Sequence, residues 1–294
     1  MIPSPSASGS AYLGDGEYET LRGLVYAHFG ITLGEAKRPM VTGRLQALLA
    51  EYGLATYGEL CALLEQDRSG RALSSLVNRL STNHSFFYRE EAHFRFFEQV
   101  ALPEALAAAR AEGRRDLRIW SAGCSTGEEP YMLAMLMRER LGEDYARWDA
   151  GVLATDISDE VLAAARLGAY PFENVRRVPR ALRDKYFQEL GREQWRVGDW
   201  VRKEVTFRKF NLMTPRLPFR KPFQVIFCRN VMIYFDPGVK AALVESLYGH
   251  TMPGGYLFIG LSETLRDLAT AYRFVQPGIY RRPPETGAAG ASPG

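Results

Sequence analysis

One stretch decides the fold class: Leu117-Arg-Ile-Trp-Ser-Ala-Gly-Cys-Ser-Thr-Gly-Glu-Glu-Pro-Tyr131. Apolar residues at its start give way to small residues from Ser121 to Gly127, and from Tyr131 onward apolar residues recur at helical spacing. This pattern predicts a strand, a tight turn and a helix. Because Gly123 and Gly127 have no Cβ atom and can adopt positive φ, a ligand can approach the backbone of this turn closely.

The turn differs from the glycine patterns that bind phosphate. It matches neither G-x-G-x-x-G nor a phosphate loop, and two carboxylates, Glu128 and Glu129, follow Gly127 in place of a lysine. A carboxylate at this position would repel a pyrophosphate. An acidic pocket lined by glycines suits a ligand with hydroxyls and a cationic head, and S-adenosylmethionine is such a ligand. Taken alone, the turn is also compatible with an ordinary strand-to-helix connection of an α/β sheet.

Composition and charge narrow the function classes. The chain has 294 residues, of which 46% are hydrophobic and 24% are charged, as in globular proteins. Its formal net charge of +3 is too small to indicate a nucleic-acid-binding protein. No run of about 18 apolar residues occurs, and the start of the chain lacks the charged and apolar regions of a signal peptide. These features predict a cytoplasmic protein without membrane insertion.

The cysteines and histidines do not indicate a metal site. Cys61, Cys124 and Cys228 are widely spaced, and the 4 histidines do not pair at the spacing of metal ligands. We therefore expect reduced cysteines and no bound metal.

The character of the sequence changes along the chain. Residues 1–14 and 283–294 are rich in small residues and proline, and we expect disordered tails there. Residues 15–80 carry apolar residues at helical spacing, interrupted by glycines, which predicts a small all-helical domain. Its second helix is expected to begin near Arg38 and carries Arg44. These arginines offer a basic face to an acidic partner, with an ordinary solvated face as the alternative.

The segment 81–92 is unusual for a linker because three consecutive aromatic residues, Phe86, Phe87 and Tyr88, stand between polar residues. One of these rings is suited to stack on a purine, with Asn83 and Ser85 hydrogen-bonding polar groups of the ligand. The alternative is that the aromatic side chains are simply buried between two domains.

A second signal follows one βαβ unit after the glycine turn. Residues 152–155 predict a short buried strand that ends at Asp156, and Ser158 is placed to cap a helix over 159–167. In doubly wound folds an acidic residue at the end of the second strand binds the ribose hydroxyls of the ligand. We therefore expect Asp156 to hold a ribose.

The alternation of strands and helices is interrupted over about 170–205. There Trp195-Arg-Val-Gly-Asp-Trp-Val201 predicts a hairpin around a Gly-Asp turn, as part of a small antiparallel insertion. Strands are expected again over 206–212, 223–228 and 256–259, with a helix after Asp236 between the last two. A hairpin around Pro277-Gly278 is expected to end the domain.

The chain resembles the CheR family, the chemoreceptor glutamate methyltransferases of bacterial chemotaxis. Five stretches carry this resemblance in family order: Ser81-Thr-Asn with the following Phe-Phe-Tyr-Arg89, Ser121 to Tyr131, Ala154-Thr-Asp-Ile157, Phe227-Cys-Arg-Asn-Val-Met-Ile-Tyr-Phe-Asp236 and Gly254-Gly-Tyr-Leu-Phe-Ile-Gly260. It implies an all-α N-terminal domain over 15–80, a linker over 81–92 and a class I (Rossmann-like) methyltransferase domain over 93–282, with an antiparallel β-subdomain inserted at about 170–205.

The resemblance also implies an activity and its residues. The family transfers the methyl group of S-adenosylmethionine to receptor glutamate carboxylates, leaving glutamyl methyl esters and S-adenosylhomocysteine. The implied cofactor contacts are Asn83, Ser85, Arg89, Glu129, Asp156, Asn211, Leu212, Arg229 and Asn230. We expect Arg89 and Tyr234 to hold the substrate carboxylate. Their alternative roles are an ion pair between domains and a buried aromatic side chain.

The implied partner is the cytoplasmic helical bundle of methyl-accepting chemotaxis receptors. In some family members the β-subdomain binds a peptide at the receptor C-terminus, and those members share a Gly-x-Gly loop. Here the segment from Phe187 to Trp195 is compact and has a single glycine, so we expect independence from this C-terminal pentapeptide. Two other readings remain open: a methyltransferase acting on RNA or a small molecule, and a catalytically silent cofactor-binding protein.

Overall fold

The computed structural model describes residues 12–80 and 85–285. The chain forms two compact units, which divide after residue 82. The predicted tails lie largely outside the described residues; where the chain is described, Leu13 is buried in the helical unit. None of the described helices is long and apolar enough to cross a membrane.

The first unit is all-helical, as predicted. Its core is made by apolar residues that repeat along each helix, including Leu21, Leu45, Leu60 and Leu76. The elements are α1 (Asp15–Phe29), the 3-10 helix η1 (Glu35–Lys37), α2 (Arg38–Tyr52), α3 (Tyr57–Gln66) and α4 (Arg71–Leu80).

The basic residues of α2 have partners inside this unit. Arg38 donates to the carbonyl of Leu13 at 3.0 Å and pairs with Asp15 at 2.6 Å. Arg44 donates to the carbonyl of Leu80 at 2.7 Å and so satisfies one of the unpaired carbonyls at the end of α4. Both arginines therefore contribute to the helical unit itself.

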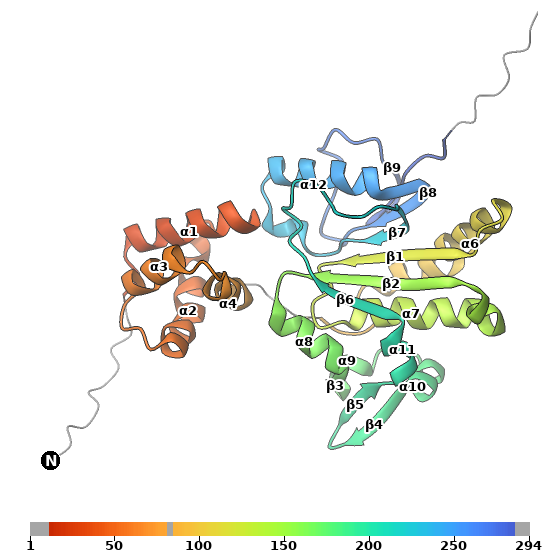
Figure 1. The fold of residues 1–294 in the computed structure, drawn as a ribbon, viewed down its shortest axis with the longest axis horizontal. Coiled ribbons are helices and arrows are strands. Elements are labelled where there is room, and N and C mark those ends of the chain that lie inside the picture. The colour runs from red at the N-terminus through yellow and green to blue at the C-terminus, as the bar shows by residue number, and fades with distance from the viewer. Residues whose placement is uncertain (1–11, 81–84, 286–294) are drawn as a thin grey trace, which may run out of the picture. The chain divides into compact units, whose positions relative to one another are not determined.

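The second unit is built on a seven-stranded sheet with the order β6-β2-β1-β7-β8-β10-β9 (Figure 1). The pairs from β6 to β8 are parallel, and β10 runs antiparallel to both of its neighbours. The strands are β1 (Asp116–Ala122), β2 (Asp149–Asp156), β6 (Val205–Lys209), β7 (Phe223–Phe227), β8 (Thr251–Phe258), β9 (Arg273–Gln276) and β10 (Ile279–Arg281). The predicted hairpin around Pro277-Gly278 is therefore confirmed.

Helices cover both faces of the sheet, with α12 on one face and α7 and α8 on the other (Figure 1). The sheet has a hydrophobic core on each face, and β1 contributes side chains to both. Leu117 and Ile119 pack in the same core as α7, whereas Trp120 packs in the same core as α12. The helical elements are α5 (Glu91–Phe96), the π-helical η2 (Phe97–Ala101), α6 (Leu102–Ala111), α7 (Glu128–Leu141), η3 (Gly142–Arg147), α8 (Asp159–Leu167), η4 (Met232–Tyr234) and α12 (Pro237–His250). Ser158 caps α8 as predicted, accepting from Val161 N at 3.2 Å.

The insertion contains a three-stranded antiparallel sheet in the order β3-β5-β4. Its elements are β3 (Ala169–Pro171), α9 (Phe172–Val175), α10 (Arg180–Tyr186), β4 (Phe187–Gly191), β5 (Gln194–Val197) and α11 (Asp199–Lys203).

The hairpin predicted around Gly198-Asp199 is wrong. The chain turns at Arg192 and Glu193, which both adopt positive φ, and Gly198 instead precedes α11 in an extended conformation. Positive φ at two successive residues is typical of a two-residue hairpin turn. The hairpin turn is therefore at residues 192–193, six residues before the predicted Gly-Asp turn. The insertion itself, and its antiparallel character, are as predicted.

Candidate functional site

The strand order reverses at β1, because β2 and β6 lie on one side of it and β7 and β8 on the other. In open α/β sheets, ligands bind beyond the carboxyl ends of the strands at such a point. Four of the residues singled out in the sequence lie at this edge: Glu129 after β1, Asp156 at the end of β2, Asn211 after β6 and Arg229 after β7. The topology therefore brings together residues that are up to 100 positions apart in the sequence.

The glycine turn requires its glycines. Gly123 and Gly127 adopt φ of 77° and 95°. A Cβ atom at Gly123 would collide with Val231, and one at Gly127 would lie 2.9 Å from the Cβ of Ala165. The turn is also tied to β2, because the amides of Gly123 and Cys124 both donate to the carbonyl of Thr155. Close packing thus leaves this turn no room for larger residues.

Asp156 is aimed at the same turn. Its two carboxylate oxygens accept from the amides of Ser125 at 2.9 Å and Ser158 at 3.0 Å. Burial raises the pKa of this carboxyl in spite of these hydrogen bonds. Each oxygen retains a lone pair after one bond, so the carboxylate can still accept from ligand hydroxyls.

The two neighbouring glutamates after the turn have different surroundings. Glu129 accepts from Ser121 Oγ at 2.7 Å and from Arg229 Nη1 at 2.9 Å, which fixes its carboxylate at the edge of the sheet. Glu128 is fully buried and accepts from Thr126 and from Asn174 of the insertion. Glu129 is therefore the carboxylate suited to bind a cation, whereas Glu128 links the turn to the insertion.

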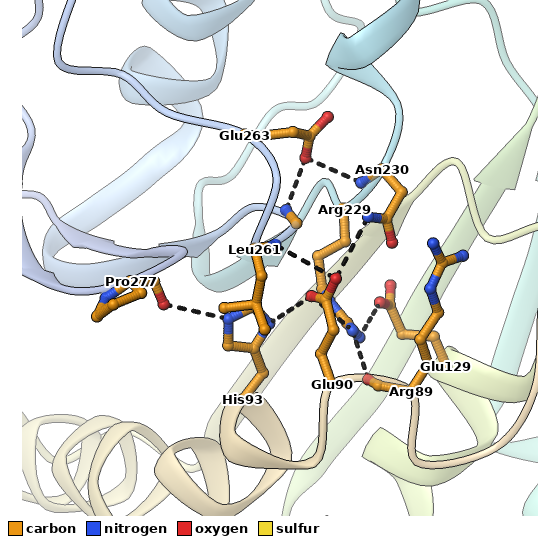
Figure 2. Close-up of polar contacts among 10 residues, drawn as sticks. Arg89, Glu90, His93, Glu129, Arg229, Asn230, Leu261, Glu263 and Pro277 are labelled. Atoms are coloured by element: carbon orange, nitrogen blue, oxygen red, sulfur yellow. Dashed lines mark hydrogen bonds and ion pairs between the residues drawn. The ribbon is translucent and has the colours of Figure 1, made fainter.

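Arg229 is buried in a network of acceptors (Figure 2). Besides Glu129, it contacts Glu90 through Nε at 3.3 Å and Nη2 at 3.1 Å, and Nη2 also donates to the carbonyl of Arg89. Every nitrogen of the guanidinium therefore has a protein acceptor. We infer that this side chain acts chiefly by holding Glu129 and the segment around Arg89.

Asn230 adopts a left-handed conformation with φ of 58°. Its amide and that of Gly260 both donate to the buried carboxylate of Glu263, at 2.9 and 2.6 Å, and its side chain donates to Glu90 at 3.3 Å. A Cβ atom at Gly260 would collide with the Asn230 side chain. The loops after β7 and β8 are thus held together around Asn230.

The aromatic residues of the 81–92 segment belong to the core of the second unit. Phe87 is fully buried against Tyr170 and Phe187, and Tyr88 stacks on Phe94. Stacking of Phe87 or Tyr88 on a purine is therefore excluded by burial. Phe86 is half-buried beneath the guanidinium of Arg177.

The remaining residues predicted to bind cofactor or substrate have surroundings of several kinds. The carbonyl of Ser85 accepts from Asn174 at 3.1 Å, while Asn83 lies outside the described residues. Asn211 uses its side-chain oxygen to accept from the amide of Met213 at 2.9 Å, and Leu212 is partly buried against the core cluster that contains Trp120. The two candidates for substrate binding are Arg89, which is half-buried and whose carbonyl accepts from Arg229, and Tyr234, which is half-buried on η4.

Sequence reasoning missed Glu90, His93, Asn174 and Glu263. Each is buried or half-buried and bonds to a segment far away in the sequence, such as Glu90 to Arg229 across 139 positions. Nothing in the local sequence marks such contacts.

These residues fit S-adenosylmethionine. Glu129 presents a fixed carboxylate, which can match an ammonium group, and Asp156 presents acceptor oxygens, which can match hydroxyls. The glycine turn carries no side chain at positions 123 and 127. Ser125 Oγ in this turn is buried without a hydrogen-bond partner in the described part of the chain. Among the described residues, no group of three or more His, Cys, Asp or Glu side chains could hold a metal ion.

An open α/β sheet with an acidic, glycine-lined edge of this kind defines a class I methyltransferase. The family model for the CheR methyltransferase SAM-binding domain matches residues 83–280, and the model for the CheR methyltransferase all-alpha domain matches residues 16–81. The chain belongs to the CheR methyltransferase family, and its cofactor is S-adenosylmethionine. The family, the fold class and the cofactor predicted from the sequence are therefore confirmed.

Similar proteins match almost the whole chain. The chemotaxis protein methyltransferase of Borreliella burgdorferi is 38% identical over 266 residues, which are 90% of this chain and 94% of that protein. Chemotaxis protein methyltransferase 1 of Pseudomonas aeruginosa is 37% identical over 272 residues, 90% of this chain and 97% of that protein. The chemotaxis protein methyltransferase of Escherichia coli is 34% identical over 271 residues, 91% of each.

Proposed function

We propose that this enzyme transfers the methyl group of S-adenosylmethionine to glutamate side-chain carboxylates of methyl-accepting chemotaxis receptors. The products are glutamyl methyl esters, which serve sensory adaptation, and S-adenosylhomocysteine. The names of the similar proteins support a role in chemotaxis. The observation that carries the proposal is that Arg229 binds both the Glu129 carboxylate and the backbone carbonyl of Arg89, since this brings an anion for a cationic cofactor close to the residue proposed to bind an anionic acceptor.

The reaction needs few chemical groups. The cofactor supplies a methyl group activated by its sulfonium, and a glutamate carboxylate is already ionised at neutral pH. The protein therefore needs no general base for this acceptor. Its contribution is to orient the two reactants and to exclude water, and orientation alone can lower a barrier by roughly 7–11 kcal/mol.

Each residue has a role in this proposal. Glu129 binds the ammonium group of the cofactor and Asp156 binds its ribose, with Asn83, Ser85, Asn211, Leu212 and Asn230 completing the pocket. Arg229 holds Glu129 in place. Arg89 binds the substrate carboxylate by charge-assisted hydrogen bonds, and the Tyr234 hydroxyl donates to the same group.

The test is transfer of labelled methyl from S-adenosylmethionine to membranes that contain chemoreceptors, followed by treatment with mild alkali. We expect label on the receptor band that alkali releases as methanol, because methyl esters are base-labile. Label that resists alkali, or label on another acceptor such as RNA, would contradict glutamyl ester formation. We propose that the enzyme acts at the cytoplasmic helical bundle of the receptor.

We also propose that receptor recognition does not require a C-terminal pentapeptide. The connection between β4 and β5 is a two-residue turn, Arg192-Glu193, next to Gly191. A turn this short offers little additional surface for a bound peptide. In calorimetry, the receptor pentapeptide is expected to give no heat of binding at micromolar concentrations. Saturable micromolar binding would show that the insertion serves as a tether site.

A further inference from the structure

Glu90 links three segments at the edge of the sheet. Its Oε2 atom lies 3.1 Å from Arg229 Nη2 and 3.2 Å from His93 Nδ1, while Oε1 accepts from Asn230 Nδ2 at 3.3 Å and from the amide of Leu261 at 3.2 Å (Figure 2). One carboxylate thus connects the start of α5 with the loops after β7 and β8. Glu90 itself adopts a left-handed conformation with φ of 58°.

A left-handed conformation is energetically costly for a residue with a side chain. Such strain persists only where the surrounding contacts over-determine the conformation, and it is concentrated at functional sites. Here the conformation directs the Glu90 carboxylate toward Arg229 and Asn230, two of the residues proposed to form the cofactor pocket. The strained residue therefore stands next to the site.

His93 supports Glu90 from the buried side. The ring has no exposed surface, with Nε2 lying 3.3 Å from the carbonyl oxygen of Pro277 and Nδ1 lying 3.2 Å from the Glu90 carboxylate. A Cβ atom at Gly278 would collide with this ring, which shows how closely it is enclosed.

Arg229 lies between two carboxylates, Glu90 at 3.1 Å and Glu129 at 2.9 Å. Burial opposes ionisation of Glu90, but His93, Arg229 and the Leu261 amide outweigh it and lower the pKa of this carboxyl to about 2. A buried pair that loses one partner leaves an uncompensated charge, so each member depends on the others.

We infer that Glu90, which lies against the buried ring of His93, is a positioning residue that sets Arg229 and thereby the cofactor-binding carboxylate of Glu129. This inference rests on the proposed function of the site. The connection runs from His93 through Glu90 and Arg229 to Glu129. When Glu90 loses its charge, Glu129 is the one carboxylate partner that Arg229 retains among the described residues. We therefore expect the Arg229 guanidinium and the Glu129 carboxylate to shift together.

The test measures the binding of S-adenosylhomocysteine to the full chain by calorimetry. Groups that orient a ligand-binding residue typically change affinity by roughly 10- to 100-fold, and we expect Glu90→Gln to raise Kd by such a factor at unchanged stoichiometry. The matched control is Glu91→Gln, because Glu91 is the next residue, is exposed and pairs with Arg95. Its Kd should equal that of the unaltered chain.

A variant that is partly unfolded also raises the apparent Kd, by the reciprocal of its folded fraction. The folded fraction of Glu90→Gln, measured by circular dichroism without ligand, therefore corrects the Kd, and a corrected Kd equal to that of the unaltered chain would overturn the inference. Because no acceptor is present in this experiment, its outcome is independent of receptor methylation. Absence of methyl transfer to receptors by the unaltered chain would contradict the proposed function and leave the positioning role standing.

Discussion

Arg89 contributes its backbone and its side chain to different parts of the site. Its carbonyl accepts from Arg229, and its side chain is the part proposed to bind the substrate carboxylate. The backbone contact survives substitution of the side chain. The two contributions of this residue can therefore be separated by mutation.

Replacing Arg89 with alanine is expected to lower kcat by roughly 10²–10³-fold, the usual effect of losing one charge-stabilising donor. The free energy of unfolding should change by less than about 1 kcal/mol, because the carbonyl of residue 89 remains. Methyl transfer and urea unfolding measure the two effects. Arg95→Ala is the control, since Arg95 is an exposed neighbour whose ion pair is with Glu91; transfer by Arg89→Ala at the rate of this control would contradict the catalytic role.

The Glu90 carboxylate gives a prediction for acid conditions. Its pKa is lowered to about 2 in the folded protein, so the stabilisation is complete above the ordinary pKa of a glutamate and is lost as the pH falls toward 2. At pH 6 the unaltered chain should exceed Glu90→Gln in free energy of unfolding by about 3 kcal/mol, and at pH 3 by about 1 kcal/mol. Denaturant unfolding at both values measures the gap. A gap that does not change with pH would contradict the assigned ion pair.

At the scale of elements, the junction between β1 and α7 depends on glycines for reasons of space. Gly127 has φ of 95°, and an added Cβ would meet both Ala165 of α8 and the Tyr170 hydroxyl. The same junction carries Glu129 and faces Asp156. Packing of the turn against α8 and the position of both carboxylates are therefore coupled.

Gly127→Ala is expected to destabilise the protein by about 3 kcal/mol and to weaken cofactor binding, because left-handed strain and overpacking add. Gly113→Ala is the matched control: Gly113 also has positive φ, at 69°, but a Cβ added there would have no neighbouring atom within 4 Å. Gly113→Ala should lower the free energy of unfolding by about 1 kcal/mol, the cost of the backbone strain alone. Thermal unfolding measures the stability of both variants, and equal losses would contradict the contribution of overpacking at Gly127.

The helices and strands can be predicted from local sequence patterns, whereas the turns and loop contacts that connect them cannot. Apolar spacing predicts β1, β2, β7 and the helices that flank them, because each of these elements buries a regular face. The turn at Arg192-Glu193 was missed because neither residue favours positive φ, while the Gly-Asp pair nearby does. The contacts of Glu90 and Glu263 could not be predicted either, since they depend on how the loops after β7 and β8 meet.

At the scale of the whole molecule, the two units have separate cores. The buried cluster of the first unit contains Cys61, and the two clusters of the second contain Cys124 and Cys228. Burial raises the pKa of all three thiols, that of Cys61 to about 11. In the native state these thiols should therefore react slowly, and each becomes reactive when its own unit opens.

Ligand binding should distinguish the unfolding of the second unit from that of the first. S-Adenosylhomocysteine at about 100 times its Kd stabilises the structure that binds it by about 2.7 kcal/mol, and this gain should appear only in the second unit. We expect the urea midpoint for labelling of Cys228 to rise with ligand, while the midpoint for Cys61 stays unchanged and lies lower, because a small core buries less surface. Mass spectrometry of thiol labelling across a urea series resolves each cysteine. Equal shifts of Cys61 and Cys228 would show that the two units unfold as one, and the CheR architecture would then couple its helical domain thermodynamically to the cofactor.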